Sequence, residues 1–314
     1  MTLRHELVRY LTVRRSLGYK LGTAERILRR FIEFADAEGA TYVTTDLFLR
    51  WQEVFGEAGQ QTWAARFGMV RLFAQWLHGL DPAHEVPPRG LVPSRQRRKR
   101  PYIYSEAEIA AIVEEAARLP SIYGIRGHTC STLLGLIAVT GLRISEALGL
   151  DTGDVDLDGG VLRIRCGKLG KERLIPLSGS VVERLRAYAS ERDRLLSLTP
   201  EPFFVACGGD RFGDCSARYN FALICQRIDL RHPQQYGRHG RGPRIHDLRH
   251  SFAARTIIGW YRSGKDPAHE MIKLTTYLGH VSPDHTYWYI EAVPELLELA
   301  SARITGTEGE EARQ

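Results

Sequence analysis

The sequence contains no apolar run that approaches the ~18 residues needed to cross a membrane as a helix. Its first residues include Arg4, His5 and Glu6, where a secretory signal requires an uninterrupted apolar stretch. Cysteine is scarce: there are five, an odd number, and no Cys-x-x-Cys pair, so neither a disulfide framework nor a zinc ribbon is indicated. We expect a cytoplasmic protein with reduced, mostly buried thiols and no membrane partner.

Disorder and fibrous repeats do not fit the composition, because 43% of the 314 residues are hydrophobic and 25% are charged. The length suggests about two domains. Charge is distributed unevenly, since residues 1–100 hold 17 Lys and Arg against 10 Asp and Glu, whereas the remainder is close to neutral. This asymmetry favours a module that binds a polyanion beside a module with another task, although solvated basic helices are an equal alternative.

Residues 1–86 predict an all-α bundle. Apolar side chains recur at helical spacing in three stretches, a shorter helix is expected over 46–55, and no strand pattern occurs here. Residues 87–104 then predict a linker, because prolines and a glycine precede a strongly basic run. That run would lie against nucleic-acid phosphates at little cost, although a solvated connector is the usual alternative. Its basic residues are Arg95, Arg97, Arg98, Lys99 and Arg100.

The second domain is expected over 105–314, opening with a capping box in which Ser105 and Glu108 flank a helix start. Alternating residues over 161–165 and 173–177, joined by a glycine-containing turn, predict a hairpin. Helical patterns are expected over 131–139, 181–196, 216–227, 246–261, 270–278 and 294–304. The fold class is therefore mainly α with a small antiparallel sheet, an α+β arrangement.

Three clusters of polar residues stand out in this second domain. Arg143 and Glu146 lie three apart near a helix start, a spacing that usually gives an ordinary surface ion pair. His246, Arg249 and His250 follow a basic, glycine-rich loop. The two histidines at i and i+4 suggest zinc, but no third ligand is evident, and a His and an Arg at a helix start favour a phosphate.

The third cluster begins where a helix ends at Gly279, which leaves His280 just beyond it. An aromatic segment follows, with Tyr287, Trp288 and Tyr289. Such a segment is usually core packing. On a helix, however, residues two apart point about 200° away from one another, so only one of the two tyrosines can face the arginines.

Taken together, these clusters resemble the tyrosine recombinases, also called the phage integrase family, over essentially the whole chain. The matching motifs are Thr140–Leu148, Gly167–Arg173, His246–His250 and Leu278–His280, with Tyr289 nine residues further on. The resemblance implies a helical core-binding domain, a basic linker and a catalytic domain. Two features favour a mobile-element integrase over a housekeeping Xer protein, namely the arginine-rich N-terminus and the segment Thr286–Tyr289.

The resemblance also implies a role for each matched residue. Tyr289 is the nucleophile that forms a 3′-phosphotyrosyl link, and Arg143 and Arg249 bind the phosphate. Lys168 is the general acid, with Lys171 as its rival. The remaining implied roles are His246 as proton acceptor or phosphate ligand, His280 as donor to a phosphate oxygen and Glu146 as their support. Tyr287 and Trp288 are expected to be packing residues, and His250 and His285 to be structural.

Double-stranded DNA is the expected partner, with a homo-tetramer, or a hetero-assembly with related recombinases, on two DNA sites. The stretch 294–304 could dock into a neighbouring subunit or pack on its own domain. No cofactor is expected. The arginines could replace a metal, because they can stabilise the phosphoryl transition state, and ATP is not needed because a reversible phosphotyrosyl bond conserves the energy of the broken strand. Two alternatives remain, namely a catalytically inactive DNA-binding protein of the same fold and a type IB topoisomerase-like enzyme that relaxes DNA.

Overall fold

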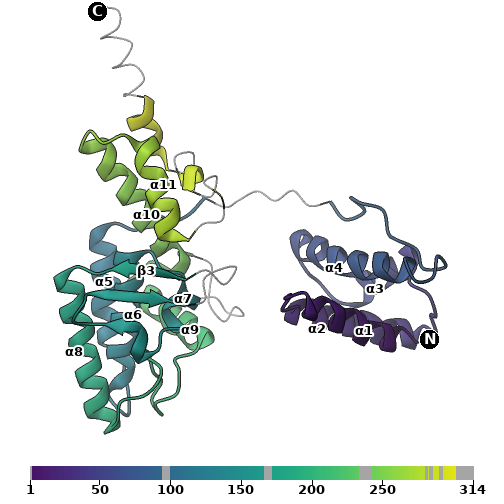
Figure 1. Cartoon of the computed structure of the whole chain (residues 1–314), viewed down its shortest axis with the longest axis horizontal. Helices are drawn as coiled ribbons and strands as arrows, with labels where there is room; N and C mark the ends of the chain where they lie inside the picture. Colours follow the sequence, from purple (N-terminus) through teal and green to yellow (C-terminus); the bar gives the residue numbers. More distant parts are fainter. Residues whose placement is uncertain are drawn as a thin grey trace, which may run out of the picture. The chain divides into compact units, whose positions relative to one another are not determined.

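The computed structural model describes residues 2–93, 100–165, 172–232, 242–279, 282, 286–289 and 293–301. The chain forms two compact units, Met1–Lys99 and Arg100–Gln314, and Figure 1 shows helices in both. No helix in the described ranges is long and apolar enough to span a membrane.

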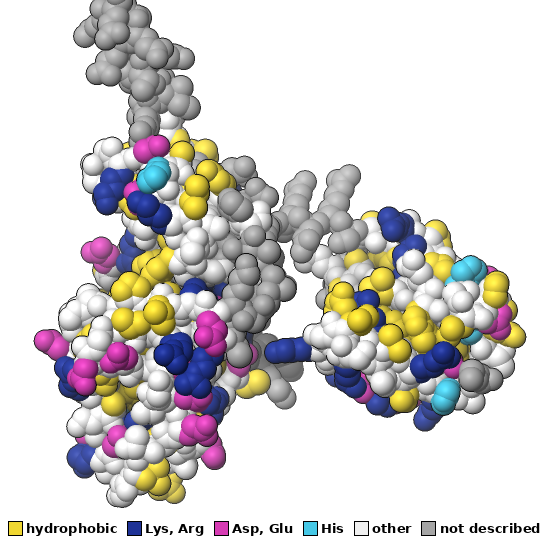
Figure 2. Space-filling view, in the orientation of Figure 1, with side chains coloured by type: hydrophobic (Ala, Val, Ile, Leu, Met, Phe, Trp, Pro, Cys, Tyr) yellow, Lys and Arg dark blue, Asp and Glu magenta, His cyan; other side chains and the backbone are white. Residues whose placement is uncertain are grey.

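The N-terminal unit is a bundle of four helices, as the apolar spacing predicts. They are α1 (Leu3–Ser16), α2 (Gly22–Ala37), α3 (Thr45–Val54) and α4 (Gln60–His78). Helix α2 contacts the other three, and its buried Phe31 packs edge-on against Trp51 of α3. Helix α3 begins where the Thr44 hydroxyl accepts a hydrogen bond from the Leu47 backbone N–H. In Figure 2, Lys and Arg side chains lie around an apolar patch on the visible face of this unit.

The C-terminal unit is built around α6, most of whose residues are buried. Helices α5, α8 and α10 pack against α6. The expected capping box is present, since Glu108 accepts a hydrogen bond from the Ser105 N–H and the Ser105 hydroxyl accepts one from the Glu108 N–H. The helices are α5 (Glu106–Ala117), α6 (Ile125–Thr140), α7 (Ile144–Leu148), α8 (Gly179–Leu196), α9 (Asp214–Arg227), α10 (Ile245–Arg262) and α11 (Pro267–Leu278). Residues 286–289 and 294–301 are also helical.

A small antiparallel sheet completes this unit, in the order β1 (Val155–Asp156), β2 (Val161–Ile164) and β3 (Arg173–Pro176). The pairing of β2 with β3 confirms the expected hairpin strands, while the turn between them lies outside the described residues. Strand β1 was not expected, because two residues are too few to show an alternating pattern. The expected fold class, mainly helical with a small antiparallel sheet, is confirmed.

Two expectations need correction. Helix α6 begins at Ile125 rather than near residue 131, because polar residues and Gly127 in its first turns obscure the apolar pattern. Of the four described cysteines, which are all free thiols, Cys130 and Cys225 are buried but Cys207 and Cys215 are exposed. The exposed pair lies in a turn and in the first turn of α9, where side chains face solvent.

Candidate active site

The site is built on the sharp corner between α6 and α7. Gly141 ends α6 with a φ of +64°, and a Cβ at this position would lie 2.5 Å from Cδ1 of Phe252. Only glycine satisfies both the left-handed backbone and this close approach. Arg143 then caps the N-terminus of α7, where Glu146 accepts a hydrogen bond from the Arg143 backbone N–H at 2.9 Å. One short turn thus holds both side chains.

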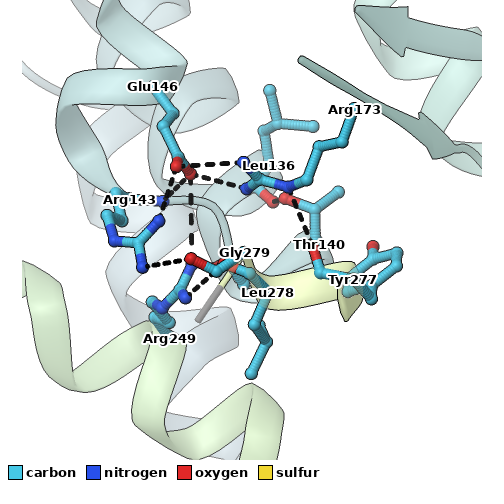
Figure 3. A network of polar contacts seen from close by, with 10 residues as sticks. Leu136, Thr140, Arg143, Glu146, Arg173, Arg249, Tyr277, Leu278 and Gly279 are labelled. Atoms are coloured by element: carbon cyan, nitrogen blue, oxygen red, sulfur yellow. Dashed lines mark hydrogen bonds and ion pairs between the residues drawn. The ribbon is translucent and has the colours of Figure 1, made fainter. Parts of the chain in front are cut away.

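Glu146 is the centre of a buried cluster of arginines rather than half of a surface ion pair. Its side chain is 3% exposed, and Arg143 Nη1 donates to its Oε1 at 2.7 Å. From β3, Arg173 donates from Nη1 at 3.1 Å and from Nη2 at 2.8 Å. Arg249 Nη1 of α10 lies 4.0 Å from Oε2. Figure 3 shows these three guanidinium groups converging on one carboxylate.

The same three arginines bind the C-terminal end of α11. The final carbonyls of a helix lack partners within the helix, and cations are favoured there by the helix dipole. The hydrogen bonds run from Arg173 Nε to the Tyr277 carbonyl at 2.9 Å, from Arg249 Nη2 to that of Leu278 at 2.6 Å and from Arg143 Nη2 to that of Gly279 at 3.0 Å. This end of α11, immediately before His280, is therefore fixed to the arginines (Figure 3).

Electrostatics keep this cluster charged. Burial raises the pKa of Glu146, but hydrogen bonds from Arg173 and from the Arg143 backbone outweigh burial and lower the pKa to about 2. Burial, reinforced by the charge of Arg143, lowers the pKa of Arg249 to about 10. Both groups are therefore ionised at neutral pH. Glu146 offsets part of the repulsion among the guanidinium groups, which leaves excess positive charge suited to an anion.

His246 lies in the first turn of α10, after Arg244, whose backbone N–H donates to Asp247 Oδ2 at 2.8 Å. Although the residue as a whole is exposed, the protein around its ring disfavours the charged form. Desolvation by the surrounding protein, followed by the nearby charge of Arg249, lowers the pKa of His246 to about 4. His246 is therefore a neutral imidazole near pH 7, able to donate one hydrogen bond and accept another.

Tyr289 lies in the helical residues 286–289 and is 1% exposed. Its hydroxyl is 2.9 Å from Nδ1 of His250. Burial raises the pKa of Tyr289, and the charges of Arg249 and Arg143 oppose this rise. Tyr287, two residues earlier, is 43% exposed, so the expectation that it packs in the core was wrong. The two tyrosines occupy different faces because a helix turns about 200° over two residues.

The structure brings four of the six expected catalytic residues to one place, since Tyr289 and His246 both lie within the electrostatic influence of Arg143 and Arg249. The expected supporting residue Glu146 is also there. Lys168, Lys171, His280 and His285 lie outside the described residues, as do Arg95, Arg97, Arg98 and Lys99, whereas Arg100 is described and exposed. His246 and His250 have ring centroids 4.5 Å apart. Across the described part of the chain, no three His, Cys, Asp or Glu residues are grouped to hold a metal.

Sequence reasoning missed two residues of this site. Arg173 belongs to a matched motif, but nothing local connects it to Glu146, which precedes it by 27 residues. His250 was interpreted as structural, yet it contacts the Tyr289 hydroxyl across 39 residues. Two sequence signals point to His250: it ends the matched motif His246–His250, and it lies four residues after His246, which places both on one helix face.

Residues 105–295 match the model of the phage integrase family. The chain belongs to the phage integrase family. This result confirms the resemblance to tyrosine recombinases and the expected enzyme class, a tyrosine-type site-specific DNA recombinase. Residues 105–295 include every described residue of the site.

Comparisons with individual proteins support membership of the phage integrase family. A protein of Sinorhizobium fredii named as an integrase/recombinase, y4rB, is 37% identical over 308 residues, covering 96% of this chain and 97% of its own. Among solved structures, XerH recombinase bound to its difH substrate is 19% identical with a TM-score of 0.64, covering 90% of this chain and 79% of its own. A lambda integrase tetramer bound to a Holliday junction is 18% identical with a TM-score of 0.59, covering 90% of this chain and 78% of its own. The two structures establish the shared fold.

Proposed function

We propose that this protein cuts and rejoins DNA at specific sites through a covalent 3′-phosphotyrosyl intermediate on Tyr289. The observation that carries the proposal is the burial of the Tyr289 hydroxyl beside Arg249 and Arg143. A buried tyrosine usually serves core packing. Guanidinium groups that already bind a carboxylate, however, add nothing to the packing of a tyrosine ring. A phenol next to concentrated positive charge is instead suited to attack a phosphodiester.

The two arginines would bind the non-bridging oxygens of the scissile phosphate. Each guanidinium has five N–H donors, so an arginine anchored by a backbone carbonyl keeps other donors for phosphate. Arg249 is anchored by the carbonyls of Gly141 and Leu278, and Arg143 by that of Gly279. Because these donors are fixed before DNA arrives, they would stabilise the charge that develops at phosphorus without reorganising.

Three further residues complete the proposed chemistry. Lys168 would protonate the leaving 5′-oxygen, and His280 would donate to a non-bridging oxygen. His246, neutral near pH 7, would donate to the phosphate or accept the phenolic proton. Attack by Tyr289 replaces one phosphate ester with another, so the energy of the broken strand is kept in the phosphotyrosyl bond. Neither ATP nor a metal ion is then required in this proposal.

The N-terminal unit supplies a second support for DNA binding. Arg26 and Arg30 of α2 and Arg66 of α4 form an arginine cluster, and burial, followed by the charges of Arg30 and Arg26, lowers the pKa of Arg66. Among the described residues, none of the three forms an ion pair with a carboxylate. Phosphates would relieve this repulsion, and the basic residues from Arg95 to Arg100 would add to the interaction.

The number of subunits in the active assembly follows from the number of DNA strands that are cut. Exchange between two duplexes breaks four strands, and each subunit offers one Tyr289, so we propose a tetramer on two DNA sites, formed with identical or related subunits. The lambda integrase tetramer on a Holliday junction, which shares the fold, supports this stoichiometry.

The test is a suicide substrate, a nicked duplex that carries the sequence the protein selects from a random DNA pool. The wild-type protein should form a covalent adduct that Tyr289→Phe cannot form, and EDTA should not prevent it. If both proteins bind the duplex but neither forms an adduct, the protein is a DNA-binding member of the fold. If supercoiled DNA without a selected site is relaxed as fast as DNA with one, the topoisomerase alternative replaces site-specific exchange.

A further inference from the structure

We propose that His250 accepts the phenolic proton when Tyr289 attacks the phosphate, an inference that rests on the proposed function of Tyr289. His250 lies on α10 one residue after Arg249, outside the set of residues that the family resemblance assigns to chemistry. Its Nδ1 is 2.9 Å from the Tyr289 hydroxyl oxygen. A proton acceptor must lie within about 2.6–3.2 Å of the atom that loses the proton, and His250 meets this condition.

The His250 ring is held in this orientation by its surroundings. Its centroid lies 5.4 Å from the ring of Tyr289, 5.7 Å from that of Trp288 and 4.5 Å from that of His246. For Nδ1 to accept the phenolic hydrogen, the neutral ring must carry its own hydrogen on Nε2. These three aromatic neighbours restrict rotation of the ring, which favours the orientation with Nδ1 at the hydroxyl.

His246 is the competing acceptor and is less suited to this step. The Tyr289 hydroxyl oxygen lies 2.9 Å from Nδ1 of His250, and the ring of His246 packs edge-on against that of His250. His246 is also a weak base, since burial and Arg249 lower its pKa to about 4. Burial meanwhile raises the pKa of Tyr289, so a weak base would be poorly matched to this phenol. His246 is better suited to donate a hydrogen bond to the phosphate.

Proton transfer to His250 accompanies a substitution at phosphorus. The O–H bond of Tyr289 breaks and an N–H bond forms at His250 Nδ1, while the phenolic oxygen forms a bond to phosphorus. The bond between phosphorus and the 5′-oxygen breaks, and that oxygen takes its proton from a separate acid, proposed above to be Lys168. In the rejoining step the 5′-hydroxyl returns its proton to the conjugate base of that acid while its oxygen forms a bond to phosphorus. The bond between phosphorus and the phenolic oxygen then breaks, and His250 returns its proton to the departing phenolate.

The experiment compares single-turnover adduct formation on the selected nicked duplex by wild type, His250→Ala and His250→Asn. Asparagine places a hydrogen-bonding group close to the position of Nδ1 but cannot take up a proton at neutral pH. Both variants should be slower by about 10²-fold to 10⁴-fold, with unchanged affinity for the duplex. His269→Ala, at an exposed histidine of α11, is the matched control and should react like wild type. Thermal melting identifies any variant that fails to fold.

Near wild-type adduct formation by His250→Asn would overturn proton acceptance by His250. A substrate with sulfur in place of the bridging 5′-oxygen gives a second readout, because a thiolate leaves without a proton. It should restore the rate of Lys168→Ala but not of His250→Asn, and restoration of His250→Asn would likewise overturn the inference. Failure of the wild-type protein to form any adduct would instead reject the proposed function.

Discussion

Arg173 lies side by side with Glu146, with two of its nitrogens donating to the two carboxylate oxygens. This bidentate pair joins the first residue of β3 to α7, and the third nitrogen of Arg173 continues to the Tyr277 carbonyl at the end of α11. Three elements that carry the site are therefore connected through one side chain. Because the Arg173 side chain is only 13% exposed, we infer that it positions Arg143 and α11 rather than contacting DNA.

Replacement of Arg173 by lysine should slow catalysis without weakening DNA binding. Lysine keeps the charge but cannot form the paired hydrogen bonds or reach Tyr277 at the same time. The resulting shift of Arg143 should reduce single-turnover adduct formation by about 10-fold to 100-fold, while the dissociation constant for the duplex stays constant. Arg218→Lys in α9, an exposed residue paired with Asp214, is the control. A loss of affinity with an unchanged rate would mean that Arg173 contacts DNA.

Glu146 should make stability depend on acidity. Its pKa falls from 4.5 to about 2 on folding, so the folded state binds this proton more weakly than the unfolded state. The stabilisation is therefore complete above about pH 4.5, is lost as the pH falls through about 2, and amounts to roughly 3 kcal/mol. Glu146→Gln should remove this component. Denaturant unfolding of both proteins between about pH 2 and pH 5 gives the free energy of unfolding at each pH. If this free energy varied with pH in the same way for both proteins, the prediction would be contradicted.

Gly141→Ala should destabilise the C-terminal unit. The left-handed backbone costs about 1–2 kcal/mol for alanine, and the contact of its Cβ with Phe252 adds about 1–3 kcal/mol. Gly259→Ala in α10 is the matched control, because its Cβ would meet nothing within 4 Å. That exchange should stabilise the unit by up to about 1 kcal/mol. Denaturant unfolding tests both, and equal effects would show that the α6–α7 corner tolerates a side chain.

The arginine cluster of the N-terminal unit should determine part of the salt dependence of DNA binding. The logarithm of the affinity falls linearly with the logarithm of the salt concentration, and each phosphate contact that is lost makes this slope shallower by about 0.9. Arg30→Ala combined with Arg66→Ala should therefore reduce the slope by roughly 1.8 on the selected duplex. Arg50→Ala is the control, because Arg50 already pairs with Asp46 and Glu38. An unchanged slope in the double variant would place the DNA contacts of this unit elsewhere.

The features that depend on near neighbours could be predicted from the order of the amino acids. Helical faces follow from apolar residues three and four apart, and the capping box at Ser105 follows from the three-residue spacing to Glu108. The same local geometry predicted that Tyr287 and Tyr289 cannot share a face, and the structure exposes one and buries the other. The spacing of the motifs also led to the family, since each motif lies within one turn or one helix end.

Which distant groups meet depends on how the helices and strands pack. A carboxylate three residues from an arginine is ordinarily a solvated surface pair, and nothing local distinguishes Glu146 from that case. Folding buries it because β3, α10 and the end of α11 each contribute a hydrogen bond or a charge to the same small volume. The contact of His250 with Tyr289 has the same origin. A linear sequence contains the two partners of a long-range hydrogen bond but not the packing that brings them together.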